Sequence, residues 1–554
     1  MGETKVAEMK GAEALVETLK QYKIETIFTV PGVQLDNLFD VFYDYQDDFR
    51  LIHCRHEQAT AYMAFGFAQS TGKVGTNMIV PGPGLLNAGA GLATAHACSA
   101  PVLCLAGQIP SKSIGKGTGM LHELDDQPGA VASVTKWAGR ANEPSEAPSV
   151  IRDAFIQLNS GRRQPVLFEM SPDIMSKRGQ VELISPITNF TEYEIDIDEA
   201  LMEEAAVLLG SAKNPAIFSG GGVFGAEEPL LALANELQAP VIMSQNGQGA
   251  VDQRNYLGQN QIAGQEMWKN FDVILAVGTR FHPPMLMWEE YQEKKLIRVD
   301  TDSRRYNDPW SADVHILGTA KKALTGIFNK VGKHNGLRPS KEVEFNEYKK
   351  AAIEKFSQGQ PQASFGKVIR DVLPDDGIIC FGVTQMGFYS WFGFPTYFPR
   401  TNIQPGYQGT LGYAFPTGLG AQVANPDKKV VAVTGDGGFM FNVQEMATAV
   451  LHKIPLVTIL FNDNTFGNVK RNQKERYNAR YICADLLNPD FMKLADSFGM
   501  ASSRVDSPEG LKAAMENAFM QDGPVLIEVE VGEMDSLWPY MPLKTIKANL
   551  PSEK

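Results

Sequence analysis

The sequence predicts an α/β protein with three doubly wound, parallel-sheet domains. Short β-branched runs alternate with helical segments along the whole chain, a pattern typical of parallel strands joined by helical crossovers. Two polar, proline-containing stretches, residues 182–196 and 330–345, interrupt this alternation and are interpreted as linkers. We therefore expect domains at residues 1–182, 196–332 and 345–540, followed by a tail at 541–554.

Each of the three blocks contains four apolar runs that are expected to be strands. The runs are short, rich in valine, isoleucine, leucine and phenylalanine, and bounded by glycine, proline or polar residues. Because they are continuous rather than alternating, they are typical of strands that are covered on both faces. The expected strands are, in order, 25–30, 50–54, 76–80, 101–107, 215–221, 240–244, 273–278, 296–300, 377–382, 429–435, 456–462 and 524–531.

The composition excludes several classes of protein. The net charge of −13 over 554 residues offers no basic surface for nucleic acid or an anionic membrane. Five scattered cysteines without a CxxC pair argue against a disulfide framework or a zinc site. No apolar run approaches the roughly 18 residues of a membrane-spanning helix, and the N-terminus has no signal-peptide pattern. We expect a soluble, cytoplasmic protein without nucleic-acid or membrane partners.

The stretch from residue 430 to 467 places two carboxylates where two strands end. The strands 429–434 and 456–461 are followed by Asp436 and Asp463, and a helix is expected between them at 442–452. A right-handed crossover puts both strand ends at one edge of the sheet, where ligands bind. Neighbouring carboxylates repel unless a cation lies between them, and oxygen ligands suit Mg²⁺. Glycines around Asp436 leave room for a phosphate group, so we expect a magnesium–phosphate site.

This motif resembles that of thiamin diphosphate enzymes. "GDG", a helix, and then "ND" with Asp463 27 residues after Asp436 are similar to the group that contains acetolactate synthase, benzoylformate decarboxylase and benzaldehyde lyase. The resemblance implies that Asp436 and Asp463 bind Mg²⁺ through their side chains and Thr465 through its carbonyl. The family usually has asparagine at position 463, so the additional charge is expected to favour the metal and to repel the diphosphate.

A second motif lies in the first domain. "RHEQ" at residues 55–58, followed by an alanine-rich helix and "TGK", resembles the family segment whose glutamate binds the pyrimidine ring. Glu57 would then exchange a proton with the ring nitrogen. The loops at 80–103 and 407–424 resemble segments that lie beneath the pyrimidine and clasp the bend of the cofactor. The cofactor contacts implied by the resemblance are Glu57, Pro81, Gly82, Asn87, Gln385, Gly409, Leu411, Gly435, Asp436, Gly437, Gly438, Asp463, Thr465, Phe466 and Gly467.

The family resemblance also implies a reaction. Such enzymes decarboxylate a 2-oxo acid and transfer the resulting enamine to a carbonyl acceptor. His122 stands where benzaldehyde lyase and acetolactate synthase have a glutamine facing the substrate, and histidine is suited to shuttle protons. Val33 and Gln34 occupy the loop that lines the substrate pocket in relatives. The adjacent histidine pair of pyruvate decarboxylases is missing from residues 109–117, which disfavours conversion of pyruvate to acetaldehyde.

Several alternatives stay open from the sequence. A non-ligating decarboxylase resembling benzoylformate decarboxylase is the first, and Asn472, in place of a family tryptophan, departs from acetolactate synthase itself. A flavin-dependent oxidase is a weaker alternative: Arg280 of the flavin signature is present, but His282, Pro283 and Pro284 replace the following residues, so FAD is left open. An inactive homologue is disfavoured because Glu57 and Asp436 are both present.

The two halves of the expected site also bear on assembly. Glu57 lies in the first domain and Asp436 in the third, so each presents half a site. In relatives the cofactor lies between domains of two chains. The resemblance therefore implies a homodimer or a homotetramer.

Overall fold

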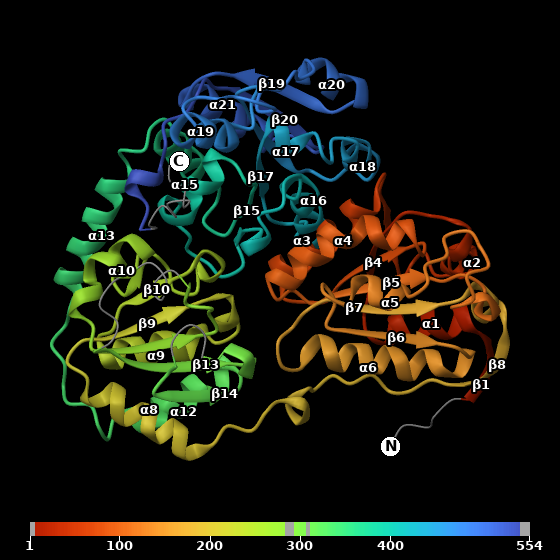
Figure 1. Cartoon of the computed structure of the whole chain (residues 1–554), viewed down its shortest axis with the longest axis horizontal. Helices are drawn as coiled ribbons and strands as arrows, with labels where there is room; N and C mark the ends of the chain where they lie inside the picture. The colour runs from red at the N-terminus through yellow and green to blue at the C-terminus, as the bar shows by residue number, and fades with distance from the viewer. Residues whose placement is uncertain (1–5, 283–287, 289–292, 306–310, 543–554) are drawn as a thin grey trace, which may run out of the picture.

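The computed structural model describes residues 6–282, 288, 293–305 and 311–542 (Figure 1). It contains three six-stranded parallel sheets, each flanked by helices, and a small two-stranded sheet. The three doubly wound domains predicted from the sequence are therefore confirmed. Among the described residues, no helix is both long enough and apolar enough to cross a lipid bilayer.

The N-terminal sheet has the strand order β3-β2-β4-β5-β7-β6. Its strands are β2 (Thr26–Thr29), β3 (Arg50–His53), β4 (Gly75–Ile79), β5 (Val102–Gly107), β6 (Trp137–Ala141) and β7 (Val166–Met170). The surrounding helices are α1 (Gly11–Gln21), α2 (Asp36–Asp44), α3 (Glu57–Thr71), α4 (Pro83–Ala97), α5 (Gln127–Val131), α6 (Ala147–Asn159) and α7 (Pro172–Ser176). Strands β1 (Val6–Lys10) and β8 (Arg178–Glu182) pair antiparallel beside this domain.

The central sheet has the order β11-β10-β9-β12-β13-β14. Its strands are β9 (Pro215–Ser219), β10 (Val241–Met243), β11 (Gly258–Gln259), β12 (Val273–Val277), β13 (Lys295–Asp300) and β14 (Val314–Leu317). Its helices include α8 (Glu199–Ser211), α9 (Glu227–Leu237), α10 (Gln261–Met267) and α12 (Ala320–Val331).

The C-terminal sheet has the order β16-β15-β17-β18-β20-β19. Its strands are β15 (Ile378–Phe381), β16 (Asn402–Ile403), β17 (Val430–Gly435), β18 (Val457–Asn462), β19 (Ala501–Val505) and β20 (Val525–Glu530). The helices of this part of the chain are α13 (Glu342–Phe356), α14 (Gln362–Val372), α15 (Gln385–Gly393), α16 (Ala414–Ala424), α17 (Asp436–Phe439), α18 (Glu445–Leu451), α19 (Gly467–Arg476), α20 (Phe491–Phe498) and α21 (Pro508–Ala518).

Each large sheet has a point where the strand order reverses. These points lie between β2 and β4, between β9 and β12, and between β15 and β17. At such points successive crossovers leave on opposite sides of the sheet, which opens a crevice at the carboxyl ends of the strands. The topology therefore provides three candidate ligand sites, one for each sheet.

The N- and C-terminal domains share a hydrophobic core. Helix α3 packs against α16, and residues from both helices belong to one buried apolar cluster. The backbones approach so closely that a Cβ at Gly66 of α3 would overlap the carbonyl of Thr417 in α16. The small residues of these helices thus fix the N-terminal domain against the C-terminal one.

The structure adds elements that the sequence pattern did not indicate. Every expected strand is present within one or two residues at its ends, but β6, β7, β11, β14, β16 and β19 and the β1–β8 pair were missed. The helix expected at 442–452 begins only at Glu445, and a short helix, α17, precedes it. Pro283, Pro284 and residues 543–554 of the expected tail lie outside the described residues. The exact domain boundaries stay a prediction.

Candidate active site

Glu57 is the first residue of α3 and follows the carboxyl end of β3. Asn87, in the second turn of α4, donates a hydrogen bond from Nδ2 to Glu57 Oε2 at 3.0 Å. A Cβ placed on Gly84 of the same helix would lie 3.6 Å from Glu57 Oε1. The start of α4 is therefore in contact with the carboxylate, and Asn87 orients it.

Pro81 and Gly82 form the connection between β4 and α4, and a buried hydrogen-bond network holds this connection. Gln127 Oε1 accepts from Gly82 N at 3.0 Å, while Gln127 Nε2 donates to Gly107 O at 3.0 Å and to Glu169 Oε2 at 2.8 Å. The Glu169 carboxylate can only accept a hydrogen bond from the side-chain nitrogen of Gln127, so the side-chain oxygen of Gln127 must face Gly82 N. Gly82 has φ of 62°. This network was not expected from the sequence, although a glutamate inside the apolar strand "VLFEM" was a signal for it.

The expected substrate-facing residues lie together beside this loop. Gln34 Nε2 donates to Leu121 O at 3.2 Å, which joins the Val33–Leu35 turn to the turn that carries His122. A Cβ at Gly82 would overlap the His122 carbonyl, so both turns border the Gly82 loop. Gln34 Oε1 and His122 Nδ1 are buried and have no hydrogen-bond partner among the described residues. Val33 is 61% exposed.

Asp436 and Asp463 lie at the ends of the neighbouring strands β17 and β18, as expected. Asp436 is only 3% exposed. Burial raises its pKa to about 6, and the charge of Asp463 contributes in the same direction. Burial also raises the pKa of Asp463. Two carboxylates that are disfavoured as anions at one sheet edge are suited to bind a cation.

Hydrogen bonds fix the orientation of both carboxylates. Asn488 Nδ2 donates to Asp436 Oδ2 at 2.6 Å and to Asn462 Oδ1 at 3.0 Å. Asp463 Oδ1 accepts from the backbone N and from Oγ1 of Thr465, both at 3.0 Å. Asn488 was not expected from the sequence, because it lies on a loop far from the motif along the chain.

The backbone around the carboxylates is tightly folded. A Cβ at Gly467 would lie 2.8 Å from Asp463 Oδ2 and 3.8 Å from Gln385 Nε2, which places the start of α15 beside the β18–α19 loop. A Cβ at Gly437 would lie 2.6 Å from the Phe466 ring. The expected phosphate-side residues therefore lie together at one edge of the sheet: Gln385, Gly435, Gly437, Gly438, Phe466 and Gly467.

This edge fits Mg²⁺ and a phosphate group by the chemistry of its donors. Mg²⁺ prefers one or two carboxylates together with carbonyl, water and phosphate oxygens. The described residues contain no group of three or more His, Cys, Asp or Glu side chains that could hold an ion. The expected ligand set needs only two such side chains, because its third protein ligand is a carbonyl.

The segment with Gly409 and Leu411 follows β16 and leads into α16. Gly409 has φ of 55°, and Leu411 is half-buried. Thr410 Oγ1 lies 2.9 Å from Thr94 Oγ1 of α4, so this segment contacts the N-terminal domain. Of the expected residues, the structure thus gathers one group at the edge of the N-terminal sheet and a second group at the edge of the C-terminal sheet.

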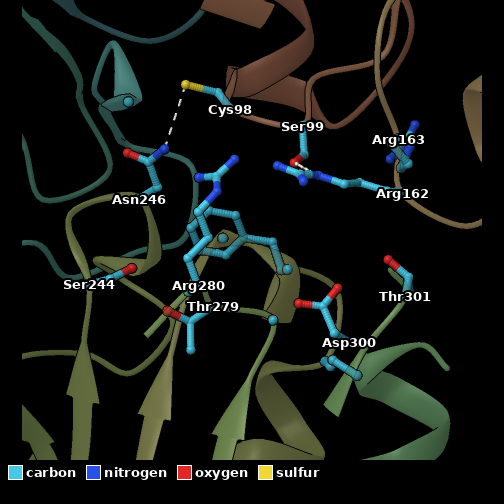
Figure 2. A pocket seen from close by; sticks show the side chains of 18 of the residues that line it. Cys98, Ser99, Arg162, Arg163, Ser244, Asn246, Thr279, Arg280, Asp300 and Thr301 are labelled. Carbon is cyan, nitrogen blue, oxygen red and sulfur yellow. Dashed lines mark hydrogen bonds between the residues drawn. The ribbon is translucent and has the colours of Figure 1, made fainter. Parts of the chain in front are cut away.

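A separate cavity of about 780 Å³ lies at the reversal point of the central sheet (Figure 2). Its walls include the glycine-rich turn Gly221–Val223 after β9 and the turn after β12. Arg162 Nε donates to Ser99 Oγ at 2.9 Å, and the Arg280 guanidinium lies 4.4 Å from the centre of the Tyr407 ring. Figure 2 shows Asp300 and Arg162 on different walls of this cavity. Burial raises the pKa of Asp300.

Three family models match the chain in the order of its three sheets. They are the N-terminal TPP binding domain of thiamine pyrophosphate enzymes at residues 9–129, the central domain at 202–327 and the C-terminal TPP binding domain at 382–529. The chain belongs to the thiamine pyrophosphate enzyme family. Membership confirms that it is an enzyme of the thiamin diphosphate-dependent type expected from the GDG and RHEQ motifs.

Relatives within this family match nearly the whole chain. It is 32% identical to the probable acetolactate synthase large subunit of Methanococcus aeolicus, over 96% of this chain and 93% of the relative. It is 30% identical to acetolactate synthase isozyme 2 large subunit of Escherichia coli, over 96% and 98%. It is 29% identical to the probable 2-ketoarginine decarboxylase AruI of Pseudomonas aeruginosa, over 94% of each chain.

Proposed function

We propose that this enzyme is an acetolactate synthase-like carboligase that uses thiamin diphosphate and Mg²⁺. It would decarboxylate a 2-oxo acid and transfer the remaining fragment to a carbonyl acceptor. The observation that carries the proposal is the pair of strand-end carboxylates, Asp436 and Asp463, within a chain that matches acetolactate synthase subunits over almost its full length.

The C-terminal edge would hold the metal and the diphosphate. Asp436 and Asp463 would supply side-chain oxygens and Thr465 its carbonyl oxygen. The raised pKa of Asp436 supports this role, because a cation would relieve the unfavourable burial of the anion. The glycines at 435, 437, 438 and 467, with Phe466 and Gln385, would surround the diphosphate, because glycine lets the backbone N–H groups approach a phosphate group closely.

The N-terminal edge would bind the pyrimidine ring. Glu57 would exchange a proton between its carboxyl oxygen and a ring nitrogen, and the 3.0 Å hydrogen bond from Asn87 would hold the carboxyl group in position. Pro81 and Gly82 would lie beneath the ring. Gly409 would accept a hydrogen bond from the amine of the cofactor through its carbonyl, and Leu411 would fill the bend between the rings.

The substrate would meet His122, Gln34 and Val33. Bound thiamin diphosphate supplies a carbon nucleophile and an electron sink for the loss of CO₂. The unpaired Gln34 Oε1 and His122 Nδ1 support a polar contact with the substrate, because buried polar atoms without partners are uncommon in proteins. His122 would move a proton to or from the substrate oxygen, and Val33 would contact its side chain.

A 2-oxo acid decarboxylase without ligase activity is the second candidate. The similarity to the probable 2-ketoarginine decarboxylase favours it. Product analysis separates the two. The enzyme would be incubated with aliphatic, aromatic and guanidino 2-oxo acids, with and without an aldehyde, and CO₂ and product masses would be measured. Hydroxy-ketone products support the ligase, whereas aldehydes alone from every donor would contradict it.

Two further features belong to this proposal. Because the two half-sites lie on different domains, we infer that the active unit is a homodimer or a homotetramer. We also infer that the enzyme acts in the cytoplasm. Light scattering that found a fully active monomer would contradict this. The cavity beside Arg280 and Asp300 has a volume within the range of small-molecule sites, and FAD or another nucleotide is left open as its ligand. Flavin absorbance of the purified protein distinguishes FAD from a nucleotide without a flavin.

A further inference from the structure

A carboxyl group outside the proposed cofactor contacts is completely buried between two domains. It belongs to Glu445, the first residue of α18, which has no exposed surface. Helix α18 follows α17, which begins at Asp436, and lies against the N-terminal domain in Figure 1. Burial raises the pKa of Glu445 to about 7, which reflects how unfavourable the anion is there. A buried carboxyl group of this kind depends on its hydrogen-bond partners.

The hydrogen bonds of Glu445 reach the segment that leads to Glu57. Its Oε1 and Oε2 accept from the backbone N of Arg55 at 3.1 and 3.2 Å, and Oε2 also accepts from Thr448 Oγ1 at 2.6 Å. Arg55 lies in the connection between β3 and α3, only two residues before Glu57. The carboxyl group therefore links the C-terminal domain to the start of α3.

The other end of α18 holds the same connection. His452, the residue that caps α18, accepts from the backbone N of His53 through Nε2 at 3.2 Å. The two histidine rings also pack edge to face, with their centres 5.1 Å apart. Residues 53 and 55 thus each donate one backbone N–H to a side chain at one end of α18.

The start of α3 depends on the geometry of this connection. His56 caps the helix by accepting from Gln58 N at 3.1 Å through Nδ1, and Glu57 is the first helical residue. A shift of Arg55 would change the direction in which the helix begins, and with it the position of the Glu57 carboxyl group. Small misplacements of a reacting group lower a reaction rate strongly.

We propose that Glu445 is a positioning residue for Glu57. It fixes the β3–α3 connection so that the Glu57 carboxyl group is held where proton exchange with the cofactor requires it. The inference rests on the proposed function for the role of Glu57, but the contact itself can be tested without cofactor. Helix α18 then joins the segment proposed to bind the metal to the segment that carries the acid–base glutamate.

The test compares Glu445→Ala, Glu445→Gln and the control Glu509→Ala by hydrogen–deuterium exchange of the protein without added cofactor. Glu509 is exposed and lies in the first turn of α21 in the same domain, so it matches Glu445 in residue type and helix position. In Glu445→Ala we expect exchange in peptides covering residues 50–62 to become about tenfold faster, because Arg55 N loses its acceptor. Glu445→Gln retains one acceptor oxygen and should restore most of the protection. The control should match the wild type.

The second readout is exchange of the C2 proton of bound thiamin diphosphate, measured by quenched-flow NMR. We expect Glu445→Ala to bind the cofactor with near wild-type affinity but to exchange this proton about 10- to 100-fold more slowly. Unchanged peptide exchange, or wild-type proton exchange despite faster peptide exchange, would overturn the proposal. Uniformly faster peptide exchange in all domains would also overturn it, because this indicates general destabilisation.

A second variant and the cofactor-free measurement cover the cases in which Glu445→Ala does not fold or the wild-type protein binds no cofactor. If Glu445→Ala does not fold, His452→Ala removes the acceptor of His53 N, and we expect a smaller increase in exchange in the same peptides; no increase would count against the proposal. If the wild-type protein binds no thiamin diphosphate, the proposed function is wrong, whereas the peptide result still decides whether Glu445 holds the Glu57 segment.

Discussion

Replacing Asp436 by asparagine is predicted to stabilise the protein without cofactor while abolishing Mg²⁺-dependent cofactor binding. The substitution conserves size, and its side-chain oxygen can still accept the hydrogen bond from Asn488. It removes a buried negative charge that lies beside Asp463. A gain in stability together with a loss of function is characteristic of a ligand whose charge is required only when a cation is present.

The magnitude follows from the pKa of Asp436. A rise from 3.8 to about 6 corresponds to about 3 kcal/mol of unfavourable free energy when the group is ionised. Relaxation and water penetration around a buried charge offset part of this, so we expect a gain of about 1–3 kcal/mol. In a domain of this size each kcal/mol raises Tm by about 2–4 °C.

The sign depends on pH. Below pH 3.8 Asp436 is protonated in both the folded and the unfolded protein, and the substitution should have no electrostatic effect. As the pH rises toward 6, the unfolded chain releases its proton first, so the wild-type protein loses stability. The advantage of Asp436→Asn should therefore grow between these values and remain constant above about pH 6.

Thermal unfolding checks this prediction at about pH 4.5 and about pH 7.5, with and without Mg²⁺ and thiamin diphosphate. Asp427→Asn is the matched control, because Asp427 is exposed and lies just before the same strand. We expect the Asp436 variant to melt higher than the wild type without ligands, and lower than the wild type with them. Equal melting without ligands at both pH values, or full stabilisation of the variant by the ligands, would refute the reasoning.

Three further substitutions test separate parts of the site. Asp463→Asn should strengthen thiamin diphosphate binding or leave it unchanged in calorimetry, because it restores the usual family ligand and removes one charge; loss of binding would contradict this. Glu57→Gln should retain cofactor affinity but slow C2 proton exchange by about 10²–10⁴-fold, and wild-type exchange would exclude Glu57 as the proton-exchanging group. His122→Ala should leave C2 exchange fast and change the ratio of aldehyde to ligated product; an unchanged ratio would remove His122 from substrate handling.

The sequence allowed the fold class and the placement of two carboxylates at neighbouring strand ends to be predicted, for physical reasons. Buried parallel strands are continuous apolar runs, and the carboxyl ends of neighbouring strands must meet at one edge, so Asp436 and Asp463 could be placed together. Strand β16, with only Asn402 and Ile403, and the more exposed β19 lack such runs and were missed. The short helix α17 was missed because "DGGF" has no helical periodicity.

The residues that hold the site in position could not be predicted. Gln127 and Glu169 act on Gly82, Asn488 acts on Asp436, and Glu445 contacts Arg55 across 390 residues of chain. None of these pairs is close in sequence, so no spacing links their members, although the glutamate inside the apolar strand β7 is an unusual residue there. Only the packing of α18 against the N-terminal domain reveals that Glu445 faces the Glu57 segment.

The most direct measurement of the central claim is a calorimetric titration of the wild-type protein with thiamin diphosphate, in the presence of Mg²⁺ and again with a chelator. We predict one binding event for each chain with Mg²⁺, little binding with the chelator, and no binding to Asp436→Asn in either case. Equal affinity with and without Mg²⁺, or undiminished binding to Asp436→Asn, would contradict the assignment of Asp436 and Asp463 to the metal and of this edge to the cofactor.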